Sequence, residues 1–174
     1  MPENVNEIEF DKLEANIISM DFFDILEKSN ITINDGYIRK EMEEIVDGIS
    51  VADRLRYSLI MEDSEYYLIF NENDRKEFLF HLFKNISLGG PICQYEDNVN
   101  EYLNATKLVY KDLIQVIMDS DTKEIKVISH VFKIKSVQKV NLFDNDHIQN
   151  FFYLIIDPSN RIVSVLYHKW TKFW

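Results

Sequence analysis

The hydrophobic pattern of this chain changes near residue 105, and this change restricts the possible fold more than any other feature. Up to that point apolar residues recur mostly at the three- and four-residue spacing of helices, whereas beyond it β-branched and aromatic residues alternate with polar ones. A helical part (about 16–105) followed by a β-rich part (about 106–170) is typical of the α+β class. We therefore predict helices packed on a mainly antiparallel sheet built from C-terminal hairpins, in a single domain of residues 1–174.

The clearest helix is predicted over residues 74–88. Asp74 is expected to cap its N-terminus, and Gly89 is expected to end it in a left-handed conformation. Large apolar side chains spread over roughly 200° of its surface, which is more than one buried face requires. The segment is therefore predicted to be the central core helix.

Two further helices are predicted in the first half of the chain. Residues 16–28 are amphipathic at helical spacing, with Ser19 as a suitable N-cap. The residues from Ser50 to Asp53 have the spacing of a capping box, which predicts that another helix begins at Ser50. The stretch 31–46 fits either a strand or an irregular segment, and its pattern does not decide between the two.

Two hairpins are predicted after the helical part. The first pairs residues 107–118 with 123–135 across a polar turn, and the second pairs 150–156 with 161–169 across a turn that contains Asp157 and Pro158. Residues 151–156 are apolar on both faces, as expected for an interior strand.

The charge of the chain limits its partners. The net charge is −11, and residues 1–87 carry 20 acidic and 9 basic side chains, whereas residues 88–174 carry 10 of each. The acidic half repels phosphate groups, so neither nucleic acid nor an anionic membrane surface is an expected partner. A basic partner protein and a merely solvated surface are both compatible with this charge.

Cysteine content and hydrophobic runs indicate the compartment. Cys93 is the single cysteine, which excludes an internal disulfide and favours a reducing environment. The first residues are polar and acidic, unlike a signal peptide, and apolar runs are shorter than the roughly 18 residues of a membrane span. We expect a cytoplasmic protein.

The sequence offers no pattern that predicts catalysis, a cofactor or a metal. The histidines are far apart and Cys93 stands alone, so no metal-ligand spacing arises. No nucleophile elbow, Walker loop or dinucleotide fingerprint is present, and nothing suggests a small-molecule substrate. The chain is expected not to be an enzyme.

One segment is a candidate for protein contact. Gly89, Gly90 and the following proline predict an exposed turn after the core helix, and Tyr95 beside Glu96 and Asp97 has the character of an aromatic anchor with a polar rim. A turn that merely joins helix to sheet explains the same residues.

Several ordered blocks of the sequence resemble the cilia- and flagella-associated protein 300 family. They span about residues 60–170, with a looser similarity over 16–59. The blocks are EDSEYYLIF (62–70), DRKEFLF (74–80), LGGPICQYED (88–97), TKLVYKDL (106–113), IDP (156–158) and VLYH (165–168).

The resemblance implies a non-enzymatic protein of motile cilia. It implies a role in the assembly or transport of axonemal outer and inner dynein arms, in the cytoplasm and in the axoneme. The implied partners are cytoplasmic dynein-arm assembly factors and the transport machinery of the cilium. A stable structural component bound to the axoneme is the alternative. The resemblance implies no catalytic residues for this chain.

Overall fold

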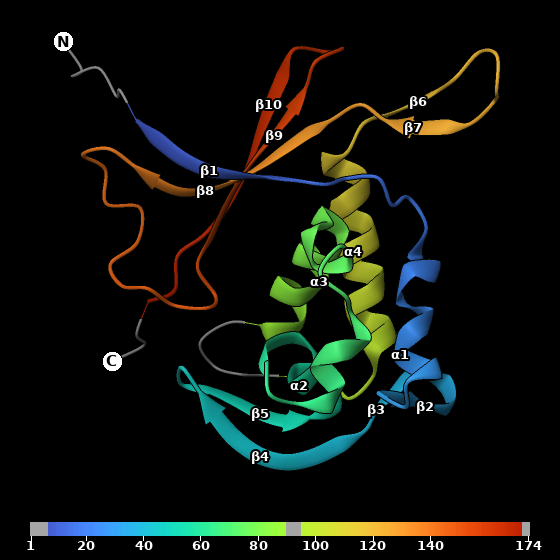
Figure 1. Cartoon of the computed structure of the whole chain (residues 1–174), viewed down its shortest axis with the longest axis vertical. Coiled ribbons are helices and arrows are strands. Elements are labelled where there is room, and N and C mark those ends of the chain that lie inside the picture. Colours follow the sequence, from blue (N-terminus) through green and yellow to red (C-terminus); the bar gives the residue numbers. More distant parts are fainter. Residues whose placement is uncertain (1–6, 90–94, 172–174) are drawn as a thin grey trace.

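A four-stranded antiparallel sheet with helices on one face forms the upper part of the molecule in Figure 1. The computed structural model describes residues 7–89 and 95–171. The strands of this sheet, in spatial order, are β1 (Ile8–Leu13), β8 (His130–Val137), β9 (Phe151–Asp157) and β10 (Ile162–His168). The predicted α+β class, with helices on a mainly antiparallel sheet, is confirmed.

β9 is the interior strand that its apolar sequence predicts. It pairs with β8 on one side and with β10 on the other. Tyr153 and Ile155 are buried against the helices, while the alternate residues of the strand face outward and are less buried. The predicted second hairpin is therefore confirmed. Its turn is held by the Asp157 carboxylate, which accepts hydrogen bonds from the backbone N–H groups of Ser159 and Asn160.

The edge strand β1 was not predicted. It comes from the N-terminal part of the chain, pairs with β8 and adds a fourth strand to the C-terminal hairpins. The alternation in Ile8–Leu13 is short and interrupted by charged residues, so strand pairing rather than local sequence selects its conformation.

The core helix is α3 (Phe78–Leu88), and it packs against α4 (Val99–Leu113) and the inner face of the sheet. Phe78 lies between them, with its ring centroid 6.0 Å from Tyr110 of α4 and 5.4 Å from Tyr153 of β9. Seven of the eleven α3 residues are buried, so the predicted central helix is confirmed. Gly89 ends it at φ +64°, a conformation that glycine adopts without strain.

The start of α3 differs from the prediction. Asp74 opens a separate 3₁₀ turn, η4 (Asp74–Lys76), where its carboxylate accepts from the Asn71 N–H. Glu77 occupies the N-cap position, but its carboxylate accepts from the Asn16 N–H instead and ties the helix start to the segment after β1.

The predicted strand over 107–118 is wrong for most of its length. α4 continues to Leu113, because Val99, Tyr102, Thr106 and Tyr110 recur at three- and four-residue spacing and bury one helical face. Of the β-branched residues that suggested a strand, Val109 lies in α4, and the others follow the end of this helix. The helical part therefore extends beyond the predicted boundary near residue 105.

The remainder of the predicted first hairpin is a short arm that projects from the molecule (Figure 1). It consists of β6 (Val116–Met118) and β7 (Ile125–Val127), joined by the predicted polar turn. The chain then continues into β8 and leaves the arm to join the main sheet.

The N-terminal part contains two small hairpins and short helices. Ser19 caps the first 3₁₀ helix as predicted, by accepting from the Asp21 N–H. The ambiguous stretch 31–46 is largely β-structure. The elements are η1 (Met20–Asp24), α1 (Ile25–Lys28), β2 (Thr32–Ile33), η2 (Asn34–Gly36), β3 (Tyr37–Ile38), β4 (Lys40–Val46), β5 (Ile49–Asp53), α2 (Arg54–Ile60) and η3 (Glu65–Ile69).

The helix predicted to begin at Ser50 begins four residues later. Ser50 lies in β5 and pairs with Ile45 of β4, because Ile49 and Val51 alternate into the core as strand residues. Asp53, predicted as the closing residue of a capping box, is itself the N-cap and accepts from the Arg56 N–H at 2.9 Å. Across the described ranges, no helix is both long and apolar enough to cross a membrane.

Candidate interaction surface

A buried arginine organises the region around the end of the core helix. Arg56 of α2 is completely buried, and its Nη1 lies 2.7 Å from the Asp53 carboxylate. Its Nη2 donates to the Ser87 carbonyl at 2.8 Å and to the Tyr102 hydroxyl at 2.6 Å. A buried guanidinium needs such partners, because an unpaired charge in the interior costs several kcal/mol. These residues and Tyr95 form what we call the Arg56 network.

The Arg56 network fixes Tyr95 and Glu96, which belong to the predicted contact segment. The guanidinium carbon of Arg56 lies 3.8 Å from the ring centroid of Tyr95, which is half-buried. The Glu96 N–H donates to the Tyr102 hydroxyl at 2.6 Å, and the Glu96 side chain is exposed. Tyr95 therefore covers the buried arginine with one face of its ring, in a cation–π arrangement.

Asp97 connects the same segment to the hairpins of the N-terminal part. Its carbonyl accepts from the Ile38 N–H of β3 at 2.8 Å, and its carboxylate pairs with the Lys40 ammonium of β4. The hydrogen bond and charge of Lys40 lower the pKa of the exposed Asp97 carboxyl. The segment thus bridges α2, α4 and the first strands while presenting Glu96 and Asp97 to solvent.

Gly89 lies at a different place, on an apolar groove of about 340 Å³ beside β10. The groove runs between α3, α4, β9 and β10, and its apolar lining comes from Leu82, Ile86, Val109, Phe151 and Leu166. Gly89 thus lines the groove, whereas Tyr95, Glu96 and Asp97 do not. Gly90, the remaining predicted contact residue, lies outside the described residues.

The groove and the Arg56 network meet at the C-terminal end of α3. Arg56 satisfies the carbonyl of Ser87, while the Gln149 amide donates to the carbonyls of Leu88 at 3.0 Å and Gly89 at 2.8 Å. The last carbonyls of a helix have no partner within the helix, so side chains from elsewhere must satisfy them. The end of α3 is thus fixed by two long polar side chains, Arg56 from α2 and Gln149 from the segment before β9.

The most strongly shifted titratable groups do not line this groove. His81 of α3 lies 3.3 Å from the Tyr153 hydroxyl, to which the Asn85 amide also donates at 3.0 Å. Burial, helped by the nearby Lys133 and Lys84 ammonium groups, lowers the pKa of His81 to about 3. Burial raises the pKa of Tyr153 to about 12. These groups stay neutral and join α3 to β9.

No cluster of three metal-ligating side chains occurs in the part of the chain that the structure describes. His81 contacts Tyr153, His147 Nε2 lies 2.9 Å from the Asp47 carbonyl, and His168 Nδ1 lies 2.8 Å from the Gln149 carbonyl. Each of these histidines therefore has a structural partner.

Sequence reasoning missed Arg56 as an organising residue. The signal is present, since Arg56 stands three residues after a helix-capping aspartate and is surrounded by apolar residues. An arginine on an otherwise buried helix with an acid one turn away is a candidate for a buried ion pair.

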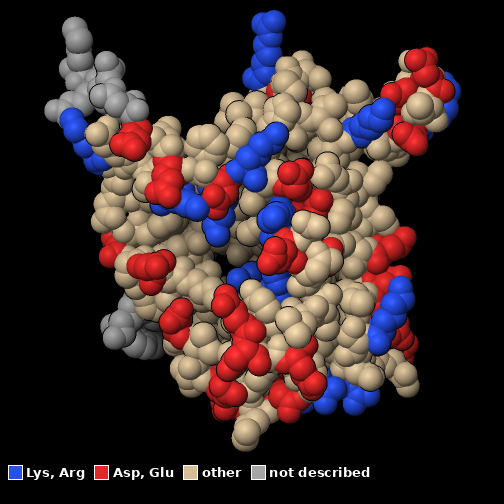
Figure 2. Space-filling model, viewed as in Figure 1, with Lys and Arg blue, Asp and Glu red and all other residues tan. Residues whose placement is uncertain are grey.

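Acidic side chains are prominent elsewhere on the surface, and Figure 2 shows them gathered where β4 and β5 lie.

The fold and its surface define an α+β protein with a buried arginine network and an apolar groove at one end of its core helix. The family model described as cilia- and flagella-associated protein 300 matches residues 1–168. The chain belongs to this family. The match also covers residues 16–59, where the sequence showed only a loose similarity, and residues 1–15.

Two relatives carry the family name. The cilia- and flagella-associated protein 300 of Paramecium tetraurelia is 39% identical over 170 residues, which cover 98% of this chain and 66% of the relative. That of Chlamydomonas reinhardtii is 36% identical over 176 residues, with 98% and 68% covered. The chain thus spans about two thirds of the length of these relatives. No solved structure matches it.

Proposed function

We propose that this protein acts in the assembly or transport of axonemal outer and inner dynein arms, and so in ciliary motility. Membership of the cilia- and flagella-associated protein 300 family is the observation that carries the proposal. The protein acts in the cytoplasm and in the motile cilium. Its partners are cytoplasmic dynein-arm assembly factors, with the transport machinery of the cilium as a further partner.

The proposed mode of action is protein binding without catalysis. The accessible features around the core helix end are an apolar groove and an anchored acidic segment, which suit protein contact. His81 and Tyr153, whose pKa values are both strongly shifted by burial, contact each other instead of lining the groove. A single domain that carries its contacts on this surface accounts for these features.

Tyr95, Glu96 and Asp97 form one part of the proposed contact surface. Their backbone is fixed by Tyr102 and by β3, so the exposed Glu96 and Asp97 side chains are presented in a defined arrangement. Fixing the segment before binding reduces the entropy lost on association. Gly89 contributes separately, as part of the groove wall.

Fractionation of ciliated cells tests the proposed role against a stable axonemal component. An assembly factor is expected mainly in the soluble cytoplasmic fraction, with a smaller ciliary pool that high salt releases. A protein that stays in the salt-washed axoneme, with little in the cytoplasm, would instead support a permanent structural component. Tubulin and a cytoplasmic chaperone mark the two fractions in the same preparation.

A further inference from the structure

β10 has the sequence of an interior strand but lies at the edge of the sheet. Its seven residues, Ile162–His168, include no acidic side chain, lysine or arginine. On the outward face Val163 and Val165 are 59% and 56% exposed, while Leu166 on the other face lines the apolar groove. Strands that are apolar on both faces are usually covered by neighbours on both sides.

The opposite edge of the same sheet is protected in the usual way. β1 carries Glu9, Asp11 and Lys12, and its register with β8 shifts between Glu9 and Phe10. The Asp11 carboxylate also forms an ion pair with Lys135 at 2.8 Å. Charged side chains and irregular register are the features that prevent an edge strand from pairing with another chain. β10 has neither.

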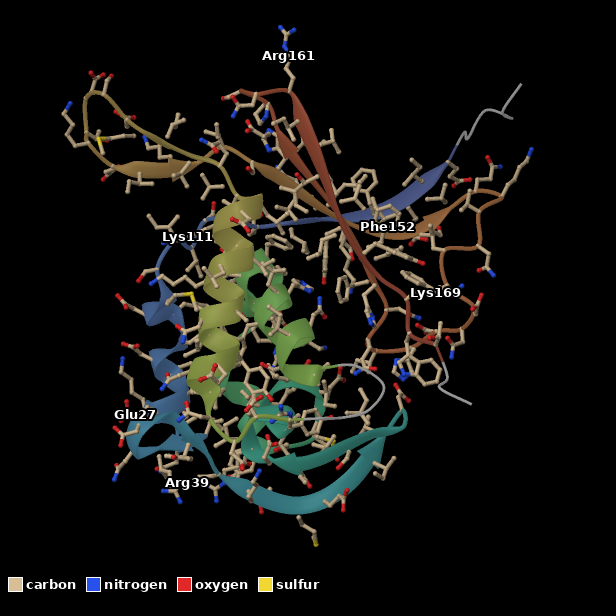
Figure 3. The ribbon with its side chains drawn as sticks, turned by 180° about the vertical axis from the view of Figure 1, so that it is seen from behind. Glu27, Arg39, Lys111, Phe152, Arg161 and Lys169 are labelled. Atoms are coloured by element: carbon tan, nitrogen blue, oxygen red, sulfur yellow. The ribbon has the colours of Figure 1, made fainter. Side chains whose placement is uncertain are left out.

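The backbone of β10 is regular and open on one side. It pairs with β9 in an unbroken antiparallel register from Ile162 to His168, and no other strand among residues 7–89 and 95–171 pairs with it. Alternate N–H and C=O groups of such a strand point away from the sheet, where an extended chain can bind them. Figure 3 shows the hairpin tip, marked by Arg161, projecting away from the helices.

We propose that an extended segment of a partner protein binds the free edge of β10 as a fifth strand and places an apolar side chain in the adjoining groove. The inference deepens the proposed function, on which it rests, by naming the mode of partner binding. Side chains of the added strand on the inner face lie beside Leu166, next to Leu82, Ile86 and Val109. Main-chain hydrogen bonds supply affinity, and the groove selects the apolar residue.

The occupant is a segment without excess negative charge from another protein. A second copy of this chain is disfavoured because each copy carries a net charge of −11. Pairing of two β10 strands alone would engage only the seven residues of each strand, against the roughly 20–30 residues per side of a stable interface. A neutral or basic segment avoids this charge repulsion, and its side chain in the groove adds contact area beyond the seven residues of β10.

Site-specific photo-cross-linking in ciliated cells tests the proposal. A photoreactive phenylalanine at Val165 is expected to cross-link to an extended segment of another protein, identified by mass spectrometry. The same group at Ile8, which is 48% exposed on β1, is the matched control and is expected to give no such product. Absence of a product at Val165, or a product with β10 of a second copy, would overturn the proposal.

A second measurement shows whether the captured segment adds as a strand. A synthetic peptide of the cross-linked sequence is added to the purified protein, and amide hydrogen exchange is followed. The outward amides of β10 are expected to exchange at least about tenfold more slowly. The Val163→Lys/Val165→Lys double variant should lose this protection, while Ile8→Lys keeps it. Unchanged β10 exchange would contradict strand addition.

The two proposals can fail separately. Strand addition by a segment of a protein without any role in dynein-arm assembly would support the β10 site and contradict the proposed function. If the peptide leaves the amide exchange of β10 unchanged but the protein is still required for dynein arms, only the proposed β10 site is contradicted.

Discussion

Arg56 and Tyr95 lie stacked, with the guanidinium carbon 3.8 Å from the ring centroid. Arg56 is fully buried, whereas Tyr95 is half-buried and belongs to the segment predicted to contact partners. A residue of the candidate surface therefore forms the cover over a buried charge. Stability and partner binding are coupled at this position, so variants must be tested for both.

Replacing Arg56 with methionine is expected to lower the free energy of unfolding by about 3–5 kcal/mol, because Asp53 is left as a buried charge without its partner. Urea unfolding followed by circular dichroism measures the loss. The Asp53→Asn/Arg56→Met double variant removes both charges and keeps a residue that can cap α2. It is expected to recover part of the stability, and a double variant less stable than the single one would contradict this account.

Tyr95→Ala is expected to weaken the co-purification of partners without unfolding the protein. Loss of the stacking on Arg56 should cost about 1 kcal/mol, which leaves the fold intact. Tyr95→Phe keeps the ring over the guanidinium and serves as the control. Either loss of the folded state or unchanged recovery of partners from ciliated cells would count against Tyr95 as a contact residue.

The folded protein is expected to lose stability as the pH falls below 6.5, in part through His81. Its pKa is lowered to about 3 in the folded state, so the unfolded chain binds an additional proton between these values. Linkage then predicts a loss of about 2.5 kcal/mol between pH 7 and pH 4.5. The contribution of neutral His81 to the free energy of unfolding is fully present above pH 6.5 and decreases as the pH falls toward 3.

The His81→Gln variant isolates this contribution, because glutamine does not titrate. Its free energy of unfolding, measured with urea across the same pH range, should decrease less steeply than that of the unmodified protein. Parallel curves for the two proteins would show that His81 titrates normally in the folded state and would refute the assignment.

The ion pair between Lys40 and Asp97 is expected to be visible by nuclear magnetic resonance. The Asp97 carboxyl should titrate below its ordinary value, because Lys40 donates a hydrogen bond to it and carries the opposite charge. In Lys40→Met this midpoint should rise toward the ordinary value. The midpoint of Asp119, lowered to about 2 chiefly by Lys126, should stay unchanged as a control.

The sequence allowed prediction of elements whose local pattern and tertiary environment agree. The core helix and the hairpin of β9 and β10 have strong apolar patterns, and burial in the structure follows these patterns. β1 could not be predicted because its conformation depends on pairing with β8, more than 100 residues away. α4 was partly mistaken for a strand because β-branched residues fit both periods over a short window.

The candidate surface was only partly predictable for a similar reason. Tyr95, Glu96 and Asp97 are neighbours in the sequence and remain together, whereas Gly89 lies on a groove that α3 forms with α4, β9 and β10. A groove of this kind depends on how helices cross a sheet, which no local pattern specifies. The edge position of β10 likewise became visible only from the strand order.

The most direct test of the central claim is electron microscopy of axoneme cross-sections from ciliated cells in which the gene has been deleted. The proposed function predicts that cilia form but beat poorly, and that outer and inner dynein arms are missing from the microtubule doublets. Reintroduction of the full-length protein should restore the arms. Deleted cells whose poorly motile cilia keep complete sets of both arms would contradict the account.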